Sequence, residues 1–308
     1  PRPRRRSATG DRRHLGAAAL VVADLTVEEV ATAAGPVGIG KDDDGWFAVV
    51  EAQPPAGMRS DDLGTVDLGA LGRMLTDSPM PMSRIQVLCL AQPPPLTGSV
   101  CAESYAALLG GATVLAHQTC WVALRLTLET AADELGTVAE TQQALAFAAN
   151  RVARLLARSG RRPVVLDGEA LRAALRYAGE LGGAGSRPGY GTGARGHGLV
   201  ERSSDVHLDG TAHACFWVSH WPRRPQAVPL AALGLAAGVP AAVSLIMQPH
   251  GDEVALRCLV RIVAAPDALR AAARRLQGGA RRLGLRLDRL DGAHALGLYA
   301  TSPTGGVG

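Results

Sequence analysis

Two stretches of similar character decide the fold: Cys-Trp-Val-Ala-Leu-Arg-Leu at residues 120–126, and Cys-Phe-Trp-Val-Ser-His-Trp at residues 215–221. Each stretch is apolar on both faces, which is typical of a strand buried inside a sheet. A helical pattern and a further strand follow each of them. The repetition predicts a core built from two similar αβ units, in which most of the unusual side chains serve packing.

The first unit is expected over residues 25–181, with the clearest helical pattern in its second half. Leu145, Ala148, Val152 and Leu155 repeat there with the helical period. The expected elements are a hairpin over 37–50 that turns at Asp44-Gly45, a helix at 68–75, a strand at 85–90, an inserted helix at 104–109, a strand at 120–128, a helix at 141–158, a strand at 163–166, and a helix at 169–177 capped by Asp167.

A Gly-rich linker at residues 182–198 separates this unit from a second one at 199–308. The second unit is expected to contain a strand at 214–219, a helix at 230–237, strands at 242–248 and 254–263, a helix from 269 capped by Asp267, and a final hairpin over 285–300 that turns at Asp291-Gly292.

This order predicts an α+β fold of two ferredoxin-like β-α-β-β-α-β modules. One larger mixed sheet with helices on both faces is the alternative.

Composition indicates a folded globular protein, with 47% hydrophobic and 19% charged residues. The five cysteines are odd in number and scattered, mostly inside apolar runs. A disulfide framework would need spaced pairs, so we interpret them as small buried hydrophobic residues in a reducing compartment. Their positions are Cys89, Cys101, Cys120, Cys215 and Cys258.

Two short motifs resemble sites for nucleotides or hard cations. Gly191-x-Gly193-x-x-Gly196 has dinucleotide-fingerprint spacing, yet a strand-like stretch follows it where the motif requires a helix. Residues 42–44 are three consecutive aspartates, which could bind Mg²⁺ but which we expect to be solvated in a hairpin turn.

Histidine and cysteine form two further candidate groups. A zinc site could draw on His207, His213, Cys215 and His220, but no second ligand pair of comparable spacing accompanies them. His117 and Cys120 could form a thiolate–imidazole pair only if the strand bends, because residues three apart face opposite sides. The sequence therefore predicts no catalytic residue, no metal ligand and no cofactor.

Residues 1–24 are expected to form a basic, membrane-proximal tail. Six arginines lie within the first thirteen residues. Such a cluster can contact nucleic acid or an anionic leaflet, follow a membrane anchor on the cytoplasmic side, or form a solvated tail. No aromatic platform or DNA-binding motif favours nucleic acid here. The longest apolar run near it, at residues 15–23, is shorter than the roughly 20 residues of a span. We expect the chain as given not to cross a membrane, and it shows no signal peptide.

Several phrases resemble the EccE component of type VII (ESX-type) secretion systems in its actinobacterial, Streptomyces-like form. The most specific is His-Gln-Thr-Cys-Trp-Val-Ala-Leu-Arg-Leu at residues 117–126. The resemblance runs in order from about residue 25 to 306. The other phrases are at residues 45–50, 104–109, 215–218, 254–261, 290–294 and 299–301.

The resemblance implies a membrane-complex subunit in which N-terminal transmembrane helices precede a cytosolic domain. Its partners would be EccB, EccC and EccD, of which EccC is the ATPase, at the cytoplasmic face of the cell membrane. The arginine cluster would then lie just past the anchoring helices. We therefore predict a non-catalytic structural subunit of the secretion core complex. Arginines such as Arg270, Arg274, Arg281 and Arg282 fit either the rim of an interface or a solvated helical face. The alternative is a nucleotide- or sugar-nucleotide-dependent transferase.

Overall fold

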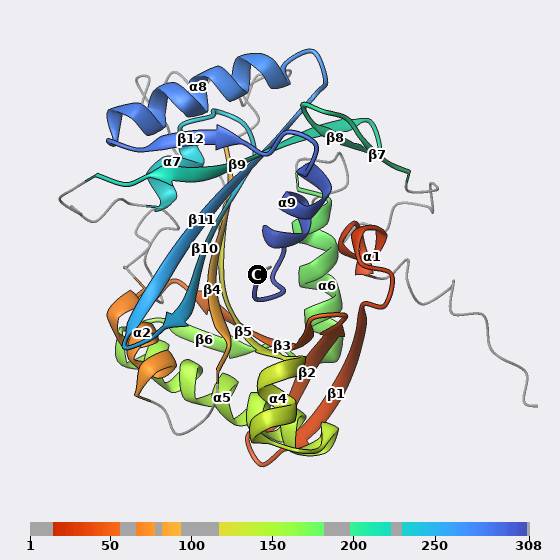
Figure 1. Ribbon diagram of the computed structural model, residues 1–308, viewed down its shortest axis with the longest axis vertical. Coiled ribbons are helices and arrows are strands. Elements are labelled where there is room, and N and C mark those ends of the chain that lie inside the picture. Colours follow the sequence, from red (N-terminus) through yellow and green to blue (C-terminus); the bar gives the residue numbers. More distant parts are fainter. Residues whose placement is uncertain are drawn as a thin grey trace, which may run out of the picture.

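A twelve-stranded sheet forms the centre of the computed structural model, which describes residues 15–55, 66–77, 82–93, 117–181, 198–222 and 230–306. The sheet curves around α6, α9 and the C-terminal end of the chain (Figure 1). Its strands are β1 (Thr26–Thr32), β2 (Gly35–Asp42), β3 (Gly45–Gln53), β4 (Arg84–Gln92), β5 (His117–Thr127), β6 (Arg162–Val165), β7 (Leu199–Glu201), β8 (Val206–Leu208), β9 (Thr211–His220), β10 (Ala241–His250), β11 (Glu253–Ala264) and β12 (Arg286–Arg289).

The strands pair in the order β1-β2-β3-β5-β4-β10-β11-β9-β8-β7, with β6 also on β3 and β12 also on β9. All these pairs are antiparallel. The two halves of the chain meet at the β4–β10 pair, from Ala241 opposite Ala91 to Met247 opposite Ile85. The larger-sheet architecture therefore fits, because one continuous sheet serves both halves.

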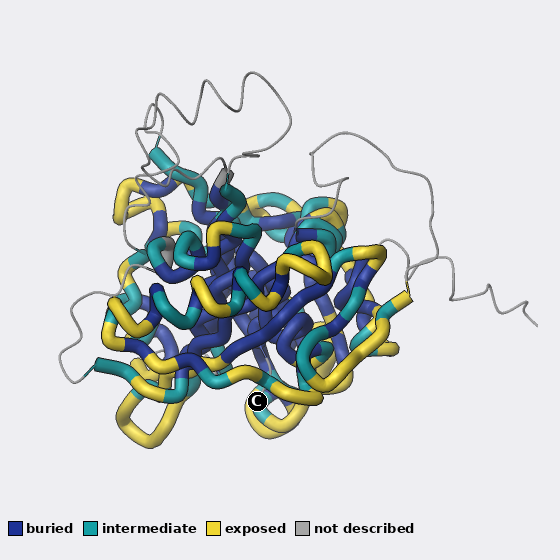
Figure 2. The backbone as a smooth tube through the Cα atoms, turned by 90° about the horizontal axis from the view of Figure 1, so that it is seen from above, coloured by how far each residue is buried: buried dark blue, intermediate teal, exposed yellow. Residues whose placement is uncertain are grey.

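Helices cover both faces of this sheet. The described helices are α1 (Ala18–Val21), α2 (Leu68–Thr76), α4 (Leu128–Glu134), α5 (Val138–Arg158), α6 (Gly168–Gly179), α7 (Leu230–Leu235), α8 (Leu269–Arg282) and α9 (His294–Ala300). On the convex face, α2, α5, α7 and α8 bury the larger apolar cluster. On the concave face, α1, α6 and Tyr299 of α9 bury a second one. In Figure 2 the buried segments gather in the middle of the molecule and the exposed ones lie mostly at its periphery.

Strand β5 shows how alternation serves both faces at once. Val122, Leu124 and Leu126 belong to the convex cluster, whereas Trp121 and Ala123 belong to the concave one. Successive side chains of a strand point to opposite faces, so a strand covered on both faces reads as a continuous apolar run. The buried-strand interpretation of residues 120–126 is confirmed.

The two halves repeat one order of elements and one order of pairing. In the first half β3, α2, β4, β5, α5 and β6 occur in this order, with the short helix α4 inserted between β5 and α5, and the strands pair as β4-β5-β3-β6. In the second half β9, α7, β10, β11, α8 and β12 do the same, with the pairing β10-β11-β9-β12. The β4–β10 contact thus joins the second strands of the two halves.

The two stretches that suggested this repetition are not structural counterparts. Residues 120–126 lie in β5, the third strand of the first half, whereas residues 215–220 lie in β9, the first strand of the second half. The counterpart of β5 is β11. The similarity arose because both strands are buried on both faces, which imposes the same composition on different positions.

The elements of the first half largely follow the sequence-based expectations. The β2–β3 hairpin forms, with Gly45 at a φ of 143° that favours glycine. Asp167 accepts a hydrogen bond from the N–H of Ala170 and caps α6. Helix α5 begins three residues earlier than expected, because Thr137 and Glu140 form a capping box.

The second half contains two wrong predictions. The final hairpin over 285–300 is instead β12 followed by α9. Asp267 does not cap α8, since the N-cap position is Ala268 and has no side-chain cap. The expected helix at 104–109 and nearly all of the linker at 182–198 lie outside the described residues.

Leu145 and Phe147 provide a matched test of how α5 contributes to stability. Leu145 is fully buried under the sheet, whereas Phe147 is 55% exposed on the same helix. We expect Leu145→Ala to lower the free energy of unfolding by about 2–5 kcal/mol, because it leaves a cavity. Phe147→Ala should lower it by less than about 1 kcal/mol. Urea denaturation measures both changes, and equal losses would contradict the assigned face of α5.

Candidate functional site

The concave face of the sheet carries an unusual set of buried polar side chains. Arg125 of β5 and Arg261 of β11 are both fully buried, and they occupy the third strand of their respective halves. The chain passes over them at residues 301–306, all of which are buried. The other buried polar side chains near this segment are Asp42, Gln86, His213 and Ser244.

Asp42 is the centre of the first cluster. Its carboxylate accepts hydrogen bonds from the guanidinium of Arg125, the hydroxyl of Tyr299, and the backbone N–H groups of Asp44 and Gly45. Arg125 in turn donates to the carbonyl of Thr304 at 2.6 Å and lies 3.1 Å from the Asp44 carboxylate. The cluster therefore ties the β2–β3 turn, β5, α9 and the C-terminal segment together.

The charges in this cluster stabilise one another. Burial acts to lower the pKa of Arg125, but Asp42, Tyr299 and Asp44 together outweigh it and the pKa of Arg125 is raised. Burial and the neighbouring Asp42 both raise the pKa of Tyr299, so its hydroxyl stays protonated and donates. This arrangement holds charge in place, and it gives Tyr299 no tendency to act as a base.

Arg261 lies in a different environment, and no ion pair to it is found among the described residues. Its guanidinium donates to the carbonyl of Ala178 in α6, approaches the carbonyl of Thr301 at 3.5 Å, and lies 3.4 Å from Nδ1 of His213. Burial lowers the pKa of Arg261 to about 10. Burial and then Arg261 hold the pKa of His213 well below its ordinary value. His213 is therefore neutral and stays so below neutral pH.

Gln86 and Ser244 connect the two clusters across the β4–β10 junction. The Gln86 amide donates to the Ser244 hydroxyl at 2.8 Å and to the carbonyl of Ala300 at 2.9 Å. Its carbonyl accepts from the N–H of Gly305 at 2.9 Å, and Ser244 also donates to Ala300. The polar groups of this face are thus engaged with the chain's own residues 300–305.

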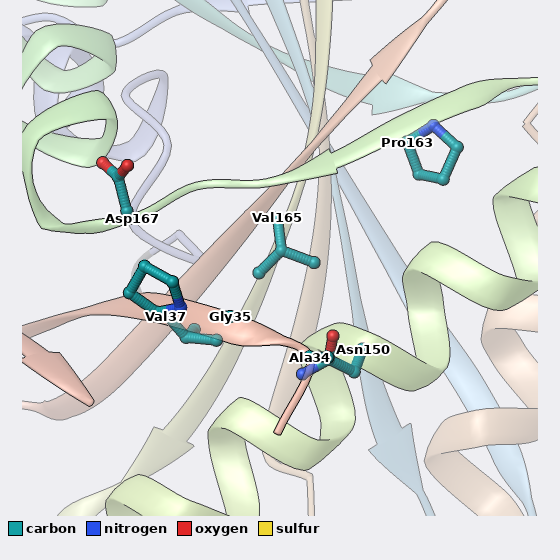
Figure 3. A pocket seen from close by; sticks show the side chains of 8 residues that line it. Ala34, Gly35, Val37, Asn150, Pro163, Val165 and Asp167 are labelled. Carbon is teal, nitrogen blue, oxygen red and sulfur yellow. The ribbon is translucent and has the colours of Figure 1, made fainter. Parts of the chain in front are cut away.

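Of two pockets, one borders this framework at Asp42, and the other is lined by none of its residues. The larger, of about 810 Å³, is lined by residues that precede α1, by the α1–β1 connection and β1, by the end of β2 and the β2–β3 turn, and by α6, among them Leu15, Leu25, Val27, Lys41, Asp43 and Arg172. The smaller, of about 340 Å³, lies between β2, β6 and α5 (Figure 3). In the smaller pocket Asp167 caps α6 and Asn150 donates to the carbonyl of Ala146. Its main polar side chains therefore serve their own helices.

The structure does not gather the candidate metal ligands into one site within its described residues. His207 pairs with Asp205 at 2.9 Å, His213 contacts Arg261, and His220 is exposed. Cys215 donates to the carbonyl of His294, and burial raises the pKa of its thiol to about 12. Within the described residues no group of three or more His, Cys, Asp or Glu side chains could hold a metal ion.

The aspartates of the β2–β3 turn divide into different environments. Asp43 is exposed and Asp44 pairs with Arg84 at 2.7 Å, but Asp42 is buried. The expectation of a fully solvated turn is wrong for Asp42, because its carboxylate accepts hydrogen bonds from Arg125 and Tyr299. The glycines at 191–196 lie outside the described residues, and so does the side chain of His117.

Comparison with known families adds the decisive observation. The family described as "Putative type VII ESX secretion system translocon, EccE" matches residues 114–218. Over these residues the chain is similar to the EccE family. The resemblance to EccE expected from the sequence is confirmed over this part of the chain. No curated protein matches the chain.

The EccE match covers one part of the polar framework. It includes Arg125 and His213, while Asp42, Arg261 and Tyr299 lie outside it. Sequence reasoning missed this framework, although one signal was available: an arginine within an apolar strand, at 125 and again at 261, requires a buried partner.

None of the described helices is long and apolar enough to span a bilayer.

The Asp42–Arg125 pair can be tested by a double-mutant cycle. Asp42→Ala leaves the buried Arg125 without its main counter-charge and should cost about 3–5 kcal/mol of unfolding free energy. The double variant Asp42→Ala/Arg125→Met should lose clearly less unfolding free energy than the sum of the losses in the two single variants. Asp43→Ala, in the exposed part of the same turn, is the control and should stay within about 0.5 kcal/mol. Additive losses in urea denaturation would contradict the coupling.

His213 predicts a dependence of stability on pH. Because its pKa is depressed in the folded protein, the unfolded chain binds a proton that the folded chain excludes once the pH falls below about 6.5. The contribution of neutral His213 to the free energy of unfolding is therefore complete above that pH. Below it the free energy of unfolding decreases by up to about 1.4 kcal/mol per pH unit. His213→Gln should flatten the decrease between pH 6.5 and 5, and an unchanged slope would contradict the assignment.

Proposed function

We propose that the chain is a non-catalytic structural subunit of the type VII secretion core complex, which stabilises the assembly on the cytoplasmic side of the membrane. The observation that carries this proposal is the EccE match over residues 114–218. That segment contains β5 and almost all of β9, which are strands of the central sheet.

The buried polar framework supports a bracing role. Arg125 connects strand β5 of the first half to Thr304, and Arg261 of the second half approaches Thr301 in the same segment. Gln86 of β4 holds Ala300 and Gly305, the residues on either side of them. A body cross-linked in this way keeps its surfaces in a fixed relation, which reduces the entropy cost of binding partners.

Helix α8 offers one such surface. Arg270, Arg274, Arg275, Arg281 and Arg282 are exposed, and the helix contains no acidic residue. Its buried residues are Leu269, Ala272, Leu276, Gly279 and Ala280. With about 100° per residue, the arginines fall on the side opposite the buried stripe. Arginine is favoured at interfaces because its planar guanidinium forms bidentate pairs with carboxylates.

Exposed apolar side chains supply the other component of an interface. Trp217 of β9 is 43% exposed and Leu256 of β11 is 50% exposed. Large aromatic residues anchor protein interfaces when the partner excludes water around them. The partners that we propose are EccB, EccC and EccD, and the six arginines within residues 1–13 favour the cytoplasmic face of the membrane.

Co-purification tests the proposal directly. The full-length protein, expressed with EccB, EccC and EccD, should be recovered with them after detergent extraction. Replacing Arg270 and Arg274 with Gln should reduce this recovery roughly 3- to 10-fold, because it removes two charges from one exposed helical face.

The matched control replaces Arg154 and Arg158 of α5, two exposed arginines at the same spacing, with Gln. This variant should be recovered like the wild type. If the full-length wild-type protein fails to join the complex, the structural-subunit function is wrong. If both variants lose recovery equally, α8 has no particular role.

A further inference from the structure

Two cysteine thiols lie directly opposite each other on neighbouring strands of the central sheet. Cys89 of β4 pairs in register with Cys120 of β5, and their sulfur atoms are 3.6 Å apart. Opposed residues of antiparallel strands have Cα atoms about 4.5 or 5.5 Å apart, and both values suit a disulfide. Bond formation would bring the sulfur atoms roughly 1.5 Å closer, to about 2.05 Å.

A buried cation accompanies this pair. Arg161, just after α5, is 5% exposed, and its Nε and Nη1 groups have no hydrogen-bond acceptor. No ion pair to Arg161 occurs within the described ranges of the chain. Its charge nevertheless acts on both thiols. A buried guanidinium without an anion is costly, and a thiolate at Cys120 would supply that anion.

The two thiols differ in a way that assigns their roles. Cys89 donates its S–H to Cys120; this bond and burial raise the pKa of Cys89 well above its ordinary value. Accepting that bond lowers the pKa of Cys120, and Arg161 lowers it further against the effect of burial. Cys258 is also buried, but burial alone raises its pKa to about 12. Cys120 is therefore the nucleophile of the pair.

We propose that Cys89 and Cys120 form a redox modification site, which a hydroperoxide oxidises to a cross-strand disulfide while Arg161 stabilises the Cys120 thiolate. The site does not depend on the proposed function. It would covalently join the two strands that flank residues 93–116. Disulfides of reducing compartments are usually transient and redox-sensing, and this pair fits that class.

The oxidation of the two thiols to a disulfide proceeds in two steps. The Cys120 thiolate attacks one peroxide oxygen, the O–O bond breaks, and hydroxide leaves and takes up a proton, so that Cys120 becomes a sulfenic acid. The Cys89 sulfur then attacks the Cys120 sulfur, the S–O bond breaks, and water leaves with the Cys89 proton. In sum, two thiols and one hydrogen peroxide give one disulfide and two waters.

The experiment treats the folded chain with hydrogen peroxide, blocks the remaining thiols, and maps disulfide-linked peptides by mass spectrometry. We expect one reversible Cys89–Cys120 link, removed by dithiothreitol. Cys89→Ser should instead leave a sulfenic acid on Cys120 that dimedone traps, and Cys120→Ser should abolish both products. Cys258→Ser is the matched control for a buried thiol and should leave the link unchanged.

Arg161→Met separates the electrostatic role from packing. It should slow oxidation of Cys120 severalfold while circular dichroism and the unfolding midpoint show that the chain still folds. A link that forms only in urea would overturn the proposal. A link from either residue to Cys101, or trapping at Cys258 as fast as at Cys120, would do the same. An unchanged rate in Arg161→Met would remove Arg161 from the site.

Discussion

The buried ion pair between Asp42 and Arg125 is the interaction on which the architecture depends. A charged side chain inside a sheet covered on both faces is tolerated only if its hydrogen bonds are met locally. Here they are met by three distant segments: the β2–β3 turn, α9 through Tyr299, and the C-terminal segment through Thr304. The pair therefore fixes where these segments lie, and it explains why residues 301–306 are buried although they form no regular element. Hydrophobic packing closes the sheet, and this cluster determines how the chain covers its concave face.

Arg261 is a second buried arginine that contacts the C-terminal segment. It lies in the second half of the molecule, and its hydrogen-bond partners differ from those of Arg125. It occupies the strand equivalent to that of Arg125, but its partners are carbonyl groups and a neutral histidine. The lowered pKa of Arg261 and the raised pKa of Arg125 follow from that difference, since only Arg125 has a carboxylate beside it. The C-terminal segment contacts both arginines, so the two repeated halves share one covering element. This shared element, together with the β4–β10 pairing, makes the sheet one body.

Sequence patterns were sufficient for the elements whose information is local. The period of Leu145, Ala148 and Val152 identified α5, and Asp167 identified the start of α6, because an amphipathic stripe and a cap depend on neighbouring residues. The end of the chain was predicted wrongly, since Asp291-Gly292 is a turn signal whether a strand or a helix follows. The framework around Asp42 could not be predicted from spacing, because Tyr299 lies 257 residues from it and only the fold brings them together. The same holds for Cys89 and Cys120, which register alone places opposite each other.

The distance along the chain between Asp42 and Tyr299 has a consequence for biosynthesis. The ribosome releases the β2–β3 turn and β5 long before α9 and residues 301–306 exist, so the first half cannot complete its hydrogen bonds during translation. Contacts of such separation form late and make folding slow. Until these last residues are synthesised, the arginines and apolar strands of the concave face are uncovered. We therefore expect this period to be when the protein is most exposed to aggregation and most dependent on chaperones.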